Sequence, residues 1–259
     1  MPKPKKTANA ATLDLFAGEP PALTWQKASY AFHSYAYRDP RTVFSAGSGS
    51  PVVSPTTVLL GIVATLFAFG RTEDAKALLP VIHQCEVMVD TPEGIIFFRA
   101  FHQLRRYETE KYGANPRLGL TKINQGTKEY GLVQGQMTLY VAAPNEHIAA
   151  VAFALKNLRH LGSHDSLCSL QGEVERCQKP ENVIYSTPDQ FSAQLSSGLI
   201  KLEGMRMTRA TLSRFNSGLI WQDRKINWFL SGGSETEQAS YIIRGGMTGT
   251  TRGKIYRRQ

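Results

Sequence analysis

The amino-acid sequence predicts an α+β fold, and three observations carry that prediction. Two segments, at residues 54–70 and 145–162, combine helix-capping residues with apolar periodicity. Segments with the alternating pattern of strands precede, separate and follow these two helices. With 259 residues and an apolar fraction of 42%, the chain is also long enough to bury a sizeable core.

The first strand and the first helix are expected in the N-terminal quarter of the chain. The strand should lie near residues 23–34. The helix should begin at Pro55, with Ser54 as its N-cap, and should end before Gly70. Its residues 58–69 leave almost no polar face, so we expect this helix to be buried nearly all round.

A short helix and two strands should follow. The helix is amphipathic, covers residues 72–79 and should stop at Pro80. The strands are expected at residues 82–90 and 94–104. The glycines and the Asn-Pro pair in residues 113–126 then favour an extended hairpin or loop over a helix.

The second major helix lies between two further strands. A strand is expected at residues 136–142, a helix should follow with Asn145 as its cap and end before Gly162, and another strand should cover residues 166–175. The resulting order, strand–helix–strand–strand–helix–strand, is the ferredoxin-like or RRM-like arrangement. The basic segment falls on the hairpin between its second and third strands.

The chain therefore divides into three expected parts. They are a flexible basic segment at residues 1–20, a ferredoxin-like domain at residues 21–180 with a thumb-like hairpin at about 99–134, and a smaller β-rich C-terminal extension at residues 181–259. In the extension, strands are expected near residues 218–226 and 241–244.

The charge pattern points to a nucleic acid. A net charge of +9 and a pI near 9.5 favour a polyanionic partner. Residues 99–128 hold seven Lys or Arg against two acidic residues, a local balance of +5, with aromatic residues interleaved. Cations that track phosphates beside flat side chains that accept bases are typical of a single-stranded nucleic-acid groove. The alternative interpretation is a solvated loop on a basic protein.

Several classes of protein are not expected. The three cysteines lack CxxC spacing, which argues against a disulfide framework or a cysteine zinc site and favours the cytoplasm. The longest apolar stretch, residues 58–69, is shorter than the roughly twenty residues of a membrane span, so no membrane partner is expected. The six histidines never pair at metal spacing, and no nucleotide-binding motif is complete, so no metal or cofactor is expected.

Catalytic groupings are sparse. His102 near Tyr107 and Lys111 is the only grouping that could cut RNA without a metal, through general acid and base roles. His164 beside Asp165 could form an acid–base pair, but such a loop pair is more often structural. We therefore expect no catalytic residues and no enzyme activity.

Three segments resemble the Cas "five" family of CRISPR-associated proteins. Residues 51–61 (PVVSPTTVLLG) resemble the opening of that family's first helix. Residues 126–141 (GTKEYGLVQGQMTLYV) are similar to its return strand after the thumb hairpin. Residues 157–162 (NLRHLG), running into residues 166–169 (SLCS), are similar to the turn after its second helix. The resemblance covers about residues 25–175.

The resemblance implies a ferredoxin-like domain of the RAMP superfamily in a non-catalytic subunit of a type I CRISPR surveillance complex, Cascade. Such a subunit serves antiviral defence and RNA-guided DNA targeting. It would hold the crRNA 5′ handle and cap the Cascade backbone filament beside the large subunit that reads the PAM. The implied partners are the crRNA 5′ handle, the Cascade backbone subunit and the Cascade large subunit, with target DNA nearby. Two alternatives are a metal-independent endoribonuclease that matures repeat RNA, as in one branch of this family, and a general RRM-like RNA-binding protein.

The candidate RNA-binding residues lie on the hairpin, after the first strand, at the start of the first helix and in the turn after the second. The helix start would offer free N–H groups to a phosphate, although a plain capped core helix needs no ligand. The two tyrosines after the first strand are equally consistent with ordinary strand residues. The full set is Tyr35, Tyr37, Arg38, Arg41, Ser54, Thr56, Thr57, Arg99, Arg105, Arg106, Tyr107, Lys111, Tyr112, Arg117, Lys122, Lys128 and His164.

Overall fold

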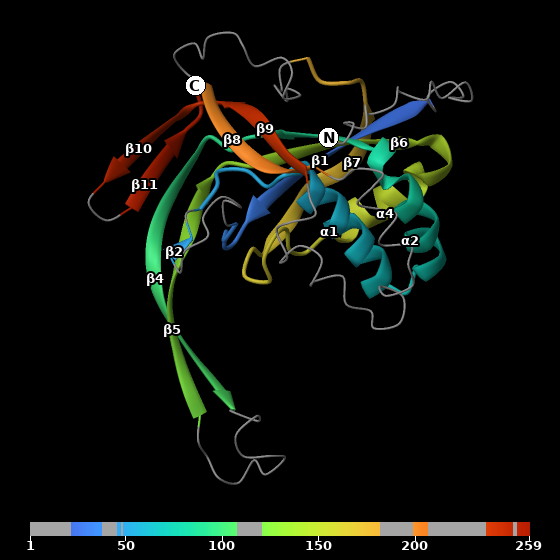
Figure 1. Ribbon diagram of the computed structural model, residues 1–259. Helices are drawn as coiled ribbons and strands as arrows, with labels where there is room; N and C mark the ends of the chain where they lie inside the picture. The colour runs from blue at the N-terminus through green and yellow to red at the C-terminus, as the bar shows by residue number, and fades with distance from the viewer. Residues whose placement is uncertain are drawn as a thin grey trace, which may run out of the picture.

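The computed structural model contains the helices and strands named below (Figure 1). The described residues are 22–37, 46–47, 49–107, 121–181, 199–206, 237–250 and 253–259. Of these, residues 46–47, 102–107, 121–126, 199–206, 237–242 and 250 are described by their backbone alone.

A four-stranded antiparallel sheet forms the centre of the fold. Its strands are β1 (Leu23–Phe32), β3 (Glu86–Asp90), β6 (Met137–Pro144) and β7 (Cys168–Cys177), in the order β3-β6-β1-β7. All neighbouring strands pair antiparallel. Helix α1 (Pro55–Ala68) precedes β3, and helix α4 (Ile148–Asn157) connects β6 to β7. This is the ferredoxin-like topology, and the predicted fold class is confirmed.

Helix α1 forms as its local signals predict. The Ser54 hydroxyl accepts a hydrogen bond from the Thr57 backbone N–H at 3.3 Å, and Pro55 is the first helical residue. Beyond the helix, Gly70 has φ +74°, the left-handed conformation expected there. Val58, Ile62, Val63 and Leu66 are completely buried.

Two elements begin later than predicted. Helix α2 (Thr72–Leu78) is followed by the 3-10 turn η1 (Leu79–Gln84), and β3 starts only at Glu86. Pro80 lies at the start of that turn, and the turn suits the fixed φ of proline. The expected strand at residues 82–90 therefore loses its first part.

Asn145 does not cap α4. The side chain of Asn145 accepts a hydrogen bond from the Thr24 hydroxyl, and the 3-10 turn η3 (Asn145–His147) leads into the helix.

A second sheet contains the hairpin. Its order is β10-β11-β4-β5-β2, made of β10 (Gly246–Thr250), β11 (Gly253–Arg257), β4 (Gly94–Tyr107), β5 (Thr121–Gln134) and β2 (Ala46–Gly47). Strands β4 and β5 pair without interruption from Gly94 opposite Gln134 to Tyr107 opposite Thr121. Figure 1 shows this pair running far out of the body of the protein.

Both sheets share one core. Ile95 and Phe97 of β4 and Tyr256 of β11 belong to the same buried cluster as Leu66 of α1. A further antiparallel pair consists of β8 (Leu199–Arg206) and β9 (Glu237–Arg244). The strand expected at residues 241–244 therefore exists within β9.

Two sequence expectations lie outside the described residues, namely the flexible segment at 1–20 and the strand at 218–226. In the described part of the chain, no helix combines the length and the apolar character that crossing a bilayer would take.

Candidate nucleic-acid interface

The hairpin of β4 and β5 has a buried base and an exposed extension. At the base, Ile95 and Phe97 are only 1% and 2% exposed, while the alternate residues Ile96 and Phe98 face outward. Further along β4, Phe101 lies on the same face as the buried Phe97, yet it is 68% exposed. The strands have therefore left the body at this point. With 14 residues each, they extend about 45 Å.

Three of the predicted RNA-binding cations belong to the extension. Arg105, Arg106 and Tyr107 lie on β4, and Lys122 lies on β5 directly opposite Arg106. Their side chains are not described, so their placement here rests on the backbone pairing of the two strands. Five other predicted residues lie outside the described residues, namely Arg38, Arg41, Lys111, Tyr112 and Arg117.

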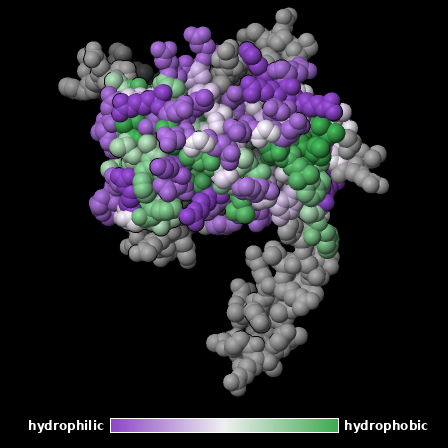
Figure 2. Space-filling model, turned by 180° about the vertical axis from the view of Figure 1, so that it is seen from behind, coloured by the Kyte–Doolittle hydropathy of each residue, from purple (hydrophilic) through white to green (hydrophobic). Residues whose placement is uncertain are grey.

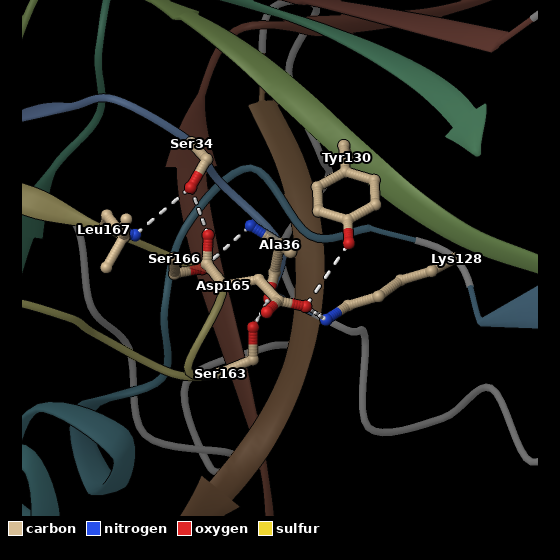
Figure 3. A network of polar contacts seen from close by, with 8 residues as sticks. All are labelled: Ser34, Ala36, Lys128, Tyr130, Ser163, Asp165, Ser166 and Leu167. Atoms are coloured by element: carbon tan, nitrogen blue, oxygen red, sulfur yellow. Dashed lines mark hydrogen bonds and ion pairs between the residues drawn. The ribbon is translucent and has the colours of Figure 1, made fainter. Parts of the chain in front are cut away.

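Lys128 is joined to the turn after α4 (Figure 3). Its Nζ forms an ion pair with the Asp165 carboxylate, and that carboxylate also accepts a hydrogen bond from the Tyr130 hydroxyl at 3.3 Å. The Lys128 ammonium lies 5.4 Å from the centre of the Tyr130 ring. Burial, followed by the charge of Asp165 and the hydrogen bond to it, raises the pKa of Tyr130. The phenol is therefore held as a neutral donor.

The turn that carries Asp165 is fixed to the segment after β1. The Ser163 hydroxyl donates to the Ala36 carbonyl at 2.8 Å, and the Ala36 N–H donates to the Ser166 hydroxyl at 2.7 Å. The Ser34 hydroxyl donates to the Asp165 carbonyl, as Figure 3 shows. These backbone and hydroxyl contacts hold the Asp165 side chain toward β5, where Lys128 meets it.

Tyr37 closes the N-terminus of α1, which favours the plain capped core helix over a phosphate site at this helix start. The Tyr37 hydroxyl accepts a hydrogen bond from the Ser54 N–H at 3.3 Å and bonds the Thr57 hydroxyl at 3.1 Å. Ser54, Thr56 and Thr57 are all buried, at 5%, 2% and 8% exposure. Tyr37 and the three helix residues thus serve the packing of α1.

Tyr35 is also a core residue, and its prediction as an RNA-stacking residue is corrected. Its side chain is 0% exposed, its hydroxyl donates to the Ser50 carbonyl at 2.7 Å, and its ring meets Phe32 edge-on at 5.2 Å. Its carbonyl accepts a hydrogen bond from the Gly131 N–H at 2.7 Å. The long-range pairing with β5 therefore takes this ring into the interior.

Glu129 is a buried carboxylate at the base of the hairpin. Its side chain is 3% exposed and is held by Lys254 of β11 at 3.0 Å and by the Gly49 N–H at 2.6 Å. The predicted RNA-binding residue Arg99 lies 3.7 Å from the same carboxylate while its own side chain stays 66% exposed. A buried charge needs such partners, so this cluster fastens β11 and the loop at Gly49 to the hairpin.

His164 is exposed beside a second histidine. The rings of His160 and His164 lie 5.4 Å apart. Burial, and then the neighbouring His164, lowers the pKa of His160. Within the described residues, no three His, Cys, Asp or Glu side chains gather as a metal site would require.

The three segments that resemble the Cas "five" family converge in space. The start of α1 meets Tyr37, the turn at residues 157–166 packs on the same tyrosine, and residues 126–141 supply Lys128 and Tyr130 to Asp165 of that turn. Sequence reasoning missed Phe98 and Tyr130, and it considered Asp165 only as a partner of His164, not of Lys128. The alternation of residues along β4 and β5 could have shown which side chains of each strand share a face. Only the register between the strands shows that Phe98 and Tyr130 are opposite each other.

Comparisons with known proteins add one structural likeness. No protein-family model matches the sequence, and no curated protein matches it. Among solved structures, the chain is similar to a CRISPR protein from Archaeoglobus fulgidus, with 13% identity, a TM-score of 0.36 and coverage of 90% of each chain. At that TM-score the likeness carries no argument about function.

Proposed function

We propose that this chain is a CRISPR-associated RNA-binding subunit of the Cas "five" type. It would hold the crRNA 5′ handle and cap the backbone filament of a type I Cascade complex beside the large subunit. The observation that carries the proposal is the long basic hairpin inserted between the second and third strands of a ferredoxin-like sheet. At its base, the segments that resemble the family meet one another.

The chemistry of the hairpin suits a single-stranded RNA. Arg105, Arg106 and Lys122 lie on the extended part of the two strands, where Arg106 is directly opposite Lys122. Cations on such an extended pair of strands suit the phosphates of a single strand. Closer to the body, Arg99 is an exposed cation on the same hairpin. The Asp165 carboxylate holds the Lys128 ammonium where the hairpin joins the body and offsets part of its charge.

The test measures binding of single-stranded repeat RNA as a function of salt. The double variant Arg105→Glu/Arg106→Glu should bind more weakly, and its log–log salt slope should be shallower by about 0.7 for each phosphate that it no longer neutralises. The matched control is Lys156→Glu/Arg176→Glu, which reverses two exposed cations on α4 and β7. An unchanged slope in the hairpin variant would remove the hairpin from the binding surface.

In this proposal the chain binds RNA without cutting it. Incubation of the purified chain with labelled repeat RNA in EDTA tests this, because the alternative is a metal-independent endoribonuclease. Cleavage by the parent protein that disappears in His102→Ala would replace the proposal with the nuclease.

A further inference from the structure

The base of the hairpin carries an exposed apolar face. The strand register sets Ile96 opposite both Leu132 and Ile255, and Phe98 opposite Tyr130. Because directly paired residues share a face of a sheet, these five side chains lie together on the side of β4 opposite the core. We name them the outer strip. Figure 2 shows apolar side chains gathered where the hairpin leaves the body.

The outer strip is exposed to solvent to the extent typical of a binding surface. Ile96 is 52% exposed, Phe98 40% and Leu132 60%. Single exposed apolar residues are ordinary, but a contiguous group on one sheet face marks a binding surface. The same strand buries Ile95 and Phe97 on its other side, so the outer strip is not needed to hold β4 in place.

The charges around the outer strip favour a polyanion. Arg257, opposite Gly94, and Lys128, opposite Ala100, lie on the same face at its two ends, about 20 Å apart along the strands. Among the described side chains of β4, β5, β10 and β11, the one acidic residue is Glu129, on the opposite face. The nearest carboxylate described at this end is that of Asp165, which is paired with Lys128.

Two rings in the outer strip are already arranged for stacking. The Phe98 and Tyr130 rings are 6.1 Å apart and inclined by only 26°. The Tyr130 hydroxyl is tied to Asp165, which fixes the ring, and the Lys128 ammonium lies beside it. A fixed aromatic surface loses little conformational entropy when a ligand stacks on it. Flat bases with phosphates on either side match this combination of rings and terminal cations.

We propose that the outer strip binds single-stranded nucleic acid, with a base stacked on the Phe98–Tyr130 pair and phosphates near Lys128 and Arg257. The inference rests on the proposed function and extends it, because it adds a base-stacking surface at the root of the hairpin. A protein partner would have to cover the same strip with an apolar surface and place acidic groups at both ends. The paired rings favour the nucleic acid.

The test replaces the Phe98 ring without removing its apolar bulk. Phe98→Leu is compared with Phe69→Leu, a matched control, since Phe69 is 41% exposed and lies at the end of α1. The probe is a single-stranded oligouridylate of about twelve nucleotides, a length that such grooves accept. A second probe is the same oligonucleotide with abasic nucleotides at its centre. Binding is measured by fluorescence anisotropy, and thermal melts check that both variants are folded.

Phe98→Leu should weaken binding of the oligouridylate by about 5- to 150-fold, the range expected for one stacked base. It should leave the salt slope unchanged, because the cations that bind the phosphates are all still present. The abasic probe should bind Phe98→Leu and the parent alike, and Phe69→Leu should behave as the parent on both probes.

Other outcomes overturn the inference. Equal losses on the normal and abasic probes would mean that Phe98 does not stack on a base. No loss at all would mean that no base stacks on the outer strip. If Phe98→Leu is neutral while Arg105→Glu/Arg106→Glu weakens binding, only the outer strip is refuted. If the parent binds neither probe nor repeat RNA, the proposed function fails as well.

Discussion

Gly162 is the position where one added methyl group should disturb both α1 and the base of the hairpin. Its φ is +98°, which side chains rarely adopt, and a Cβ there would lie 2.7 Å from Cδ2 of the Tyr37 ring. Tyr37 in turn bonds the Ser54 N–H and the Thr57 hydroxyl at the start of α1. The change Gly162→Ala therefore pushes on a ring that has little room to move.

Two costs add in Gly162→Ala. The strained backbone costs about 1–3 kcal/mol, and the overpacking against Tyr37 costs about 1–3 kcal/mol more. Gly172 is the matched control, since its φ is +79° and nothing lies within 4 Å of its would-be Cβ. Gly172→Ala should show the backbone cost alone. In a chain of this size each kcal/mol lowers Tm by about 2–4 °C, so Gly162→Ala should melt about 2–12 °C below Gly172→Ala.

Differential scanning calorimetry of both variants measures this difference, and a double variant tests its cause. In a Tyr37→Ala background, Gly162→Ala should cost less than it does alone, because the ring that it strikes is gone. Equal melting of Gly162→Ala and Gly172→Ala, or full additivity in the double variant, would refute the packing of Gly162 on Tyr37.

Three further predictions concern other groups. Glu129→Gln should lower the free energy of unfolding, measured in urea, by about 1–3 kcal/mol, because the partly buried Lys254 loses its counter-charge. The control Glu73→Gln breaks only the exposed pair with Lys76 and should cost under about 1 kcal/mol. Asp165→Asn should tighten RNA binding and steepen its salt slope by up to about 0.7, since Lys128 is no longer neutralised; weaker binding would mean that Asp165 is needed to position Lys128. Burial raises the pKa of the Cys168 thiol to about 12 from 9.0, so its contribution to stability is complete below about pH 9 and is lost as the pH rises toward 12. The urea midpoint of the parent should therefore fall more steeply across that range than the midpoint of Cys168→Ala, and parallel curves would contradict this.

Local signals in the sequence predicted the elements whose ends are set by neighbouring residues. Ser54, Pro55 and Gly70 mark the ends of α1 through contacts and backbone preferences within a few positions of each residue. The order of helices and strands followed in the same way and gave the ferredoxin-like topology. Asn145 does not act as a cap because its side chain accepts a hydrogen bond from the hydroxyl of Thr24, which is distant in sequence.

The candidate site depended more on contacts between distant segments. Tyr35 looked available for stacking beside the arginines, but its pairing with Gly131 carries the ring into the core. The outer strip needs the register of β4 with β5, and no short turn in the sequence sets that register. The Asp165 carboxylate reaches Lys128 only because hydroxyls at Ser34 and Ser163 hold its turn.

The pairing of β11 with β4 sets an order of events during synthesis. All four strands of the ferredoxin-like sheet, which ends at Cys177, can leave the ribosome long before Ile255 appears to pair with Ile96. Until then the hairpin root lacks its neighbouring strand, and the Glu129 carboxylate lacks Lys254. Pairing between such distant segments is slow, and the unpaired edge of β4 is prone to wrong partners while it waits. A growing chain should therefore be most vulnerable to aggregation after its central sheet has formed and before residues 253–257 have emerged.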